Sequence, residues 1–244
     1  SNGFAISGID EGDHAGRSVS GAGDVNGDGF DDFIISADLA DTSGRADAGE
    51  VYVVFGRKDG FEADFELSSL DGSNGFVMNG TSALNYAGYS VGGAEDVNGD
   101  GIDDLIIGIP YADVPSVNEW PGESYVVFGR ADGFDSSLEL SSLDGNNGFI
   151  LRGDQTWSNF GFSVSGAGDV NGDGVNDLIV GAPLASTDNA AQAGKSYVVY
   201  GSDQGFDSEI DVYALDGTKG CAIHGVDPPG WSGRSVNSAG EFNG

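Results

Sequence analysis

A nine-residue acidic segment occurs three times in this 244-residue chain, and its regular return constrains the fold more than any other feature. The segment reads Asp-Val-Asn-Gly-Asp-Gly, then an apolar residue, then Asp or Asn, then Asp. The copies begin at Asp24, Asp96 and Asp169, which sets a period of 72 to 73 residues. Fixed periods of this kind are typical of propellers and solenoids, whose units bury apolar surface against their neighbours. Partial copies at 2–4 and 240–244 lead us to expect a piece of a longer protein.

Each repeat reads as four short strands. A strand of small residues at 17–23 precedes the acidic segment, and apolar runs follow at 33–35, 51–55 and 75–79. The middle runs are apolar on both faces, which predicts sheets sandwiched between other sheets. The small residues suit the crowded inner strands of a propeller, and the 43 glycines suit tight turns.

The sequence therefore predicts an all-β fold, a partial β-propeller built of four-stranded antiparallel blades. We expect one domain over 1–244, with three full blades and a strand at each end. The expected parts are the last strand of a preceding blade at 1–9, blade A at 15–80, blade B at 87–153, blade C at 160–225 and the start of a further blade at 226–244. Because propellers close with about 4 to 8 blades, the remaining blades should come from missing sequence or from another chain.

The acidic segments have the donor chemistry of a calcium site. Positions one, three, five and nine carry carboxylate or amide oxygens, position seven offers its backbone carbonyl, and glycines allow the curl. Calcium takes six to eight oxygen ligands, whereas zinc prefers nitrogen or sulfur. Three Ca²⁺ sites are predicted, with these ligands: Asp24, Asn26, Asp28, Phe30 and Asp32; Asp96, Asn98, Asp100, Ile102 and Asp104; Asp169, Asn171, Asp173, Val175 and Asp177.

Two other interpretations of the acidic segment are weaker. An EF-hand loop needs a glutamate at position twelve and flanking helices, but that position is Ile35, Ile107 or Val180 within β-branched runs. Ordinary Asp/Asn/Gly turns would hold three like charges close together without an ion. Such charges repel by about 4 kcal/mol per pair at about 4 Å and an effective dielectric of about 20. We therefore expect the metal to contribute to folding.

Charge excludes some partners. The chain has 40 acidic and 9 basic residues, a formal net charge of −31. Nucleic acid binding needs a basic surface, so we expect no nucleic acid partner. No apolar run is long enough for membrane insertion. The acidic surface serves either solubility or the docking of a basic partner. The single cysteine, Cys221, stands where other repeats have phenylalanine, which predicts a buried, unreactive thiol.

Connectivity sorts the loops onto two faces. The acidic segments and the third-to-fourth linkers share one face, and the second-to-third and fourth-to-first loops share the other. Trp120, Trp157 and Tyr111 fall on the second face. Large aromatics there could form a platform for a ligand.

With these motifs in place, the chain resembles the FG-GAP repeat family, the propeller repeats of integrin α-subunits and bacterial surface proteins. Its third repeat has both name-giving motifs, Phe160-Gly161 and 181–183 (Gly-Ala-Pro). The second repeat has 108–110 (Gly-Ile-Pro), and the first repeat, with 36–38 (Ser-Ala-Asp), is the weaker match. The resemblance implies a seven-bladed propeller with calcium on one face and ligand contacts on the other.

The resemblance leads us to expect a calcium-stabilised extracellular or cell-surface module for protein recognition or cell adhesion. Its protein or glycan ligand would bind at the face opposite the calcium loops. The alternatives are a non-catalytic accessory propeller of a larger secreted enzyme and a structural spacer. We expect no enzymatic activity in this segment, because its two histidines lie apart from any nucleophile motif. The tripeptide 152–154 (Arg-Gly-Asp) matches the sequence that integrins recognise, but its glycine ends a fourth strand in every repeat, which favours a structural role.

Overall fold

The structure is a computed structural model that describes residues 3–112 and 120–238. Its regular elements are short strands and single-turn 3₁₀ helices. The strands are β1 Ala5–Ser7, β2 Val19–Gly23, β3 Asp32–Ala37, β4 Glu50–Val54, β5 Asp64–Glu66, β6 Gly75–Asn79, β7 Ser90–Glu95, β8 Asp104–Ile109, β9 Glu123–Val127, β10 Ser137–Glu139, β11 Gly148–Arg152, β12 Ser163–Gly168, β13 Asp177–Ala182, β14 Lys195–Val199, β15 Glu209–Asp211 and β16 Gly220–His224. The 3₁₀ helices are η1 Leu67–Ser69, η2 Leu140–Ser142 and η3 Val212–Ala214.

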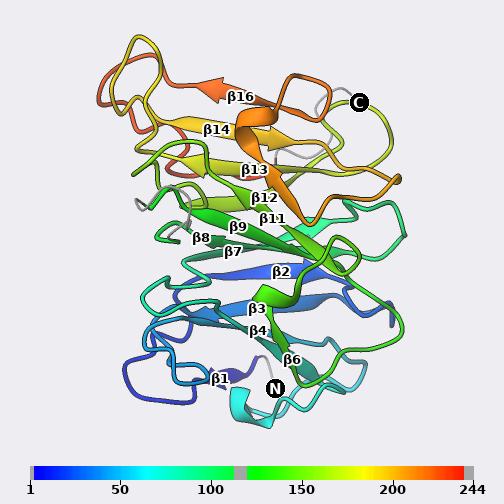
Figure 1. The fold of residues 1–244 in the computed structure, drawn as a ribbon. Coiled ribbons are helices and arrows are strands. Elements are labelled where there is room, and N and C mark those ends of the chain that lie inside the picture. The colour runs from blue at the N-terminus through cyan, green and yellow to red at the C-terminus, as the bar shows by residue number, and fades with distance from the viewer. Residues whose placement is uncertain (1–2, 113–119, 239–244) are drawn as a thin grey trace.

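Each repeat forms one antiparallel sheet of four main strands. The orders are β2-β3-β4-β6 in blade A, β7-β8-β9-β11 in blade B and β12-β13-β14-β16 in blade C. Figure 1 shows the three sheets stacked in chain order, with the N-terminal blade at the bottom. This arrangement confirms the predicted all-β, partial propeller fold.

The middle strands are apolar on both faces because neighbouring sheets cover them. Every residue of β8, β9 and β14 is buried. One core cluster joins blade A to blade B, with Ile34 and Ile107 both fully buried in it. A second cluster joins blade B to blade C. The cores therefore lie between blades as well as within them.

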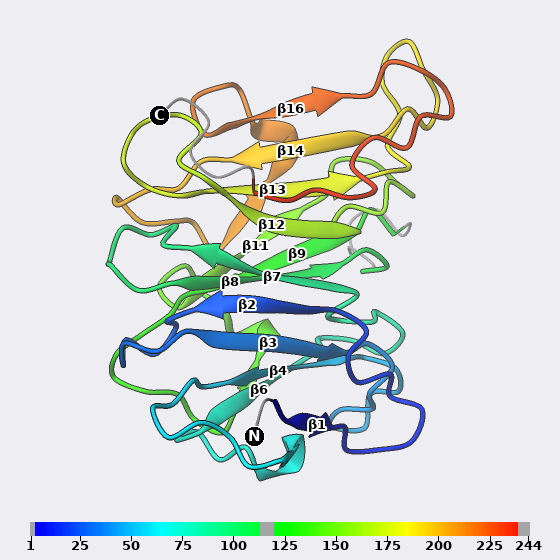
Figure 2. The same cartoon turned by 180° about the vertical axis from the view of Figure 1, so that it is seen from behind.

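The inner strands β2, β7 and β12 follow one another up the stack, as Figure 2 shows from behind. Their small residues allow a close approach of the backbones. A Cβ atom at Gly93 would lie 3.0 Å from the Gly21 carbonyl oxygen, and one at Gly166 would lie 3.1 Å from the Ala94 carbonyl oxygen. The crowding predicted for these strands is confirmed.

A fifth, parallel strand extends the first two sheets, and the sequence interpretation missed it. β10 from the linker of blade B pairs with β6 of blade A, and β15 from the linker of blade C pairs with β11 of blade B. β1 pairs with β5 in the same parallel manner. Each of these linker strands spans only three residues, which is too short to show a period. The linkers thus join each blade to the one before it.

One prediction about packing is wrong. Cys221 in β16 is half-buried rather than buried. The strand's outer residues are exposed because, in the described part of the chain, no parallel strand covers its edge. Ile223 is 51% exposed, whereas the equivalent Met78 and Leu151 are fully buried.

In residues 3–112 and 120–238, no helix is long and apolar enough to cross a membrane.

Candidate metal sites and aromatic face

The three acidic segments connect the first and second strands of their blades and curl around their own side chains. In the first loop, Asp24 Oδ1 accepts a hydrogen bond from the Asp28 amide at 3.0 Å, and Asp24 Oδ2 accepts one from the Gly29 amide at 2.8 Å. Asn26 Oδ1 accepts a bond from the same Asp28 amide at 2.9 Å. The oxygens of positions one and three therefore lie side by side.

Position five belongs to the same curl. Asp28 Oδ1 accepts a bond from the Phe30 amide at 2.9 Å, and Asp28 Oδ2 accepts one from Asn26 Nδ2 at 3.1 Å. The second and third loops repeat this pattern, with Asp100 and Asp173 in the place of Asp28. All three position-five side chains are in exposed parts of their loops.

The ninth residue of each loop differs because it is buried and holds the loop closed. Asp104 is fully buried, and its two oxygens accept bonds from the Val97 amide at 3.0 Å and the Gly129 amide at 2.8 Å. Asp32 and Asp177 make the equivalent pairs of bonds. Burial raises the pKa of Asp104 to about 8 and that of Asp32 to about 7, despite the opposing effect of the amide donors. The pKa of Asp177 is raised for the same reason.

This donor set fits a calcium ion in chemistry. The side chains of positions one, three, five and nine supply oxygen only, and calcium accepts carboxylate, amide and backbone oxygens together. In the described residues, no group of three or more His, Cys, Asp or Glu side chains is gathered closely enough to hold an ion alone. The amide at position three and the carbonyl at position seven would have to complete the set. A cation would also offset the cost of burying the ninth carboxylate.

Neighbouring loops are linked by contacts that the sequence interpretation missed. The Asp24 amide donates to Asp103 Oδ2 at 2.8 Å, and the Asp103 amide donates to the Asp24 carbonyl. In the next pair, the Asn176 amide donates to the Asp96 carbonyl at 3.2 Å. Position eight therefore bonds to the loop of the preceding blade. Position eight is Asp or Asn in every copy, and this pattern was the sequence signal from which the contact could have been predicted.

The predicted aromatic platform is partly assembled. Trp120 and Trp157 meet edge to face with ring centroids 4.7 Å apart, and their side chains are 45% and 51% exposed. The Trp157 amide donates to the Trp120 carbonyl at 3.2 Å, and Trp157 has a positive φ of 59°. Tyr111 instead packs its ring against Tyr86 and Tyr89. The two tryptophans thus form one aromatic corner, and Tyr111 belongs to another cluster.

The Arg-Gly-Asp tripeptide is held by internal contacts. Arg152 forms ion pairs with Glu123 and with Glu209, the latter at 2.9 Å. Asp154 accepts a bond from the Tyr197 hydroxyl at 2.6 Å and pairs with Lys195 at 3.2 Å. The Asp154 side chain is only 10% exposed. These contacts support the structural interpretation of the tripeptide.

Comparison with known proteins agrees with this geometry. The FG-GAP repeat model matches residues 15–54, 87–127 and 160–199, the portion of each repeat from the fourth-to-first loop to the third strand. Each match contains one acidic loop.

The similar proteins include integrin alpha subunits and a phospholipase D. Integrin alpha pat-2 of Caenorhabditis elegans is 37% identical over 138 residues, which are 54% of this chain and 10% of that protein. Integrin alpha-8 of Mus musculus is 34% identical over 136 residues, 55% of this chain and 12% of that protein. Phosphatidylinositol-glycan-specific phospholipase D of Bos taurus is 31% identical over 163 residues, 66% of this chain and 18% of that protein. The similarity thus spans less than a fifth of each relative.

Proposed function

Because this chain is built from FG-GAP repeats, we propose that it is a calcium-stabilised propeller segment of an extracellular or cell-surface protein that presents a recognition surface to a protein or glycan. The observation that carries this proposal is the threefold loop. In each copy, hydrogen bonds link the side chains of positions one, three and five, and the buried carboxylate of position nine accepts a bond from the amide of position two. We also propose the blade limits 15–80, 87–153 and 160–225.

Calcium binding is supported by the charge of the loops. The ninth carboxylates are buried at 3% exposure or less, with raised pKa values. A buried carboxylate is stable in its charged form only with a nearby positive charge or sufficient donors. A divalent ion held by the five proposed ligands of each loop would supply that charge. The segment would then gain stability from the ion.

A recognition role is supported by the aromatic corner on the opposite face. Trp120 and Trp157 come from different loops, and one backbone hydrogen bond fixes them relative to each other. Trp157 keeps a positive φ, an uncommon conformation for a bulky residue. Exposed, fixed tryptophans are frequent centres of binding energy in interfaces. We propose that these two side chains contact the ligand.

A second candidate follows from the phospholipase D similarity, which covers 66% of this chain. This segment would then be a non-catalytic accessory propeller in a larger secreted enzyme. A structural spacer is the third candidate. The accessory propeller and the spacer would both retain the calcium sites. They differ from the recognition module in the role of the aromatic face.

A binding screen separates these candidates. The calcium-loaded protein would be applied to glycan and extracellular-matrix protein arrays, beside a W120A/W157A variant. Recognition predicts a ligand whose binding falls at least tenfold in the variant. A W231A variant is a matched control, because Trp231 is an equally exposed tryptophan of a further fourth-to-first loop. Unchanged binding in the double variant, or no ligand at all, would refute the recognition role.

A further inference from the structure

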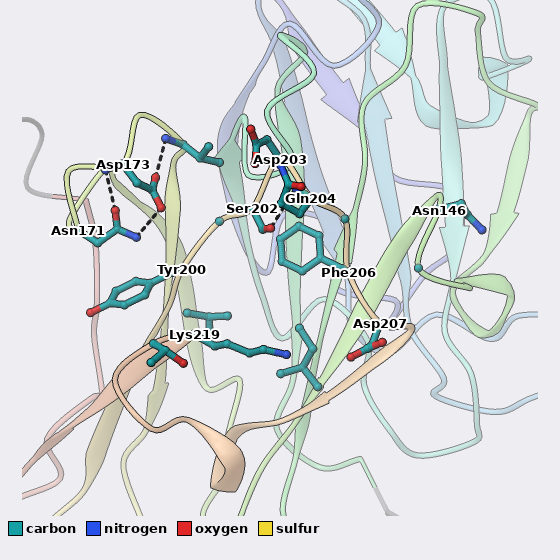
Figure 3. Close-up of a pocket in the computed structure, with 17 residues that line it drawn as sticks. Asn146, Asn171, Asp173, Tyr200, Ser202, Asp203, Gln204, Phe206, Asp207 and Lys219 are labelled. Carbon is teal, nitrogen blue, oxygen red and sulfur yellow. Dashed lines mark hydrogen bonds between the residues drawn. The ribbon is translucent and has the colours of Figure 1, made fainter.

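A cavity of about 720 Å³ opens beside the third acidic loop, on the face opposite the tryptophans. Its lining combines polar loop residues with the aromatic rings of Tyr200 and Phe206. Figure 3 shows Phe206 in the middle of the lining, with Ser202 and Asp203 above it and Lys219 below it in that view. Three proposed metal ligands of the third loop, Asn171, Asp173 and Val175, also belong to the lining.

In blade B, an arginine of the chain itself covers the ring that corresponds to Phe206. There the guanidinium of Arg130 lies over the ring of Phe134, 4.5 Å from its centroid. In blade A, Arg57 lies over Phe61 in the same way at 4.4 Å. The space beside Phe134 is also smaller, about 490 Å³. In these two blades, each phenylalanine thus has its own cation.

Blade C lacks that cation because the equivalent residue is Ser202. The chain reads Phe-Gly-Arg at 55–57 and 128–130 but Tyr-Gly-Ser at 200–202. Over the described residues, no lysine or arginine lies over the ring of Phe206. Phe206 itself is held in place by stacking on Phe149, with centroids 4.3 Å apart. The ring of Phe206 therefore occupies the position that an arginine covers in blades A and B.

The surroundings of this ring favour positive charge. Asp203 and Asp207 line the cavity together with Asp173, whereas Lys219 is the one basic residue of the lining. Asp203 is exposed, and its Oδ1 accepts a hydrogen bond from Gln204 Nε2. With calcium held by Asp173, the remaining acidic side chains still outnumber the base. An aromatic face beside carboxylates is the usual environment for a guanidinium or ammonium group.

We propose that this cavity is a binding site for an arginine side chain of a peptide or protein partner. The guanidinium would stack on Phe206 as Arg130 stacks on Phe134, and Asp203 or Asp207 would accept its hydrogen bonds. This site is distinct from the tryptophan corner and does not depend on the ligand bound there. The third blade thereby offers to a partner the position that the first two blades fill themselves.

The test uses the calcium-saturated 244-residue chain and three tripeptides with blocked ends, Gly-Arg-Gly, Gly-Lys-Gly and Gly-citrulline-Gly. Binding is followed by NMR shifts of the amides of residues 201–207. Saturable binding of the arginine peptide is expected, and the neutral citrulline peptide, which has nearly the same shape, should bind at least about tenfold more weakly. Absence of saturable shifts, or equal binding of citrulline, would overturn the proposal.

Two substitutions at one position supply the matched control. S202R places in blade C the arginine that the other blades carry, so it should occupy the ring and abolish peptide binding while the protein stays folded. S202A leaves the cavity open and should bind as the unsubstituted protein does. K219A removes the competing base and should bind more tightly. Peptide binding to S202R that equals binding to S202A would contradict the assignment.

Discussion

The backbone amide of Asp24 donates to the carboxylate of Asp103 at 2.8 Å, which joins the acidic loop of one blade to that of the next. The Asp103 amide returns a bond to the Asp24 carbonyl. Since Asp24 opens the first proposed calcium site, the geometry of that site depends on a residue of the second blade. The loops therefore form a connected row rather than three separate sites.

This connection predicts the effect of D103A. Asp103 occupies position eight, which is not a proposed ligand of its own loop, so the substitution should weaken calcium at the first loop and spare the second. Loss of one charge-assisted hydrogen bond implies a several-fold loss of affinity, about 1 kcal/mol. Calorimetric titration with calcium would resolve one weakened site. D31A is the matched control, because Asp31 is the exposed position-eight residue of the first loop.

The fifth and ninth residues of a loop should respond differently to truncation. D100A removes an exposed carboxylate, so it should reduce the calcium-induced rise in melting temperature and leave the metal-free melting temperature nearly unchanged. D104A leaves the buried Val97 and Gly129 amides without acceptors, at a cost of about 1–3 kcal/mol each. Its metal-free melting temperature should fall by several degrees. Thermal melts in the presence of chelator measure the metal-free melting temperatures of the two variants. Equal melting temperatures for D100A and D104A would contradict the structural role of Asp104.

The raised pKa values of the ninth residues predict how stability depends on pH. Asp32 and Asp104 titrate at about 7 and about 8 in the folded protein, above the ordinary value of 3.8. Folding thus favours their protonated forms, so this stabilisation is complete below about pH 4 and is lost as pH rises through 7 to 8. Calcium requires the charged forms. Metal-free stability should therefore fall between pH 5 and pH 8, and the calcium-induced gain should increase.

Urea unfolding at several pH values, with and without calcium, measures both trends. A calcium-induced gain that is the same at pH 5 and pH 8 would contradict the account.

The internal contacts of the Arg-Gly-Asp tripeptide predict a stability defect without an adhesion defect. D154A leaves the ammonium group of Lys195, 10% exposed, without its partner. Removing one partner of a buried pair costs about 3–5 kcal/mol. Unfolding curves would show this loss, whereas cell attachment to the immobilised protein should not respond to soluble Arg-Gly-Asp peptide. Inhibition of attachment by that peptide would show that the tripeptide is accessible.

The sequence predicted the parts of this structure that repeat. The acidic loops recur with fixed spacing, and the apolar runs 33–35 and 51–55 lie in β3 and around β4 as expected. The three-residue strands β10 and β15 were missed because pairing across blades leaves no local pattern. The exposure of β16 was also missed, because the burial of residue 221 depends on whether another strand pairs with the edge of β16.

The candidate metal sites were likewise predicted only as far as they depend on the repeated loop. The donor positions follow from the loop alone, whereas the contact of Asp103 with Asp24 depends on how two blades stack. The cavity at Ser202 is identified by comparing blade C with blades A and B, in which Arg57 and Arg130 lie over phenylalanine rings. The sequence shows a serine at position 202 where the other repeats have arginine, but it does not show the cavity beside Phe206.

The central claim is that calcium binds the three loops and stabilises the propeller. Isothermal titration of the metal-free chain with calcium, paired with thermal melts, tests it most directly. The account predicts three calcium ions per chain and a melting temperature that rises with calcium and falls again with chelator. No heat of binding, together with identical melts in calcium and in chelator, would contradict it.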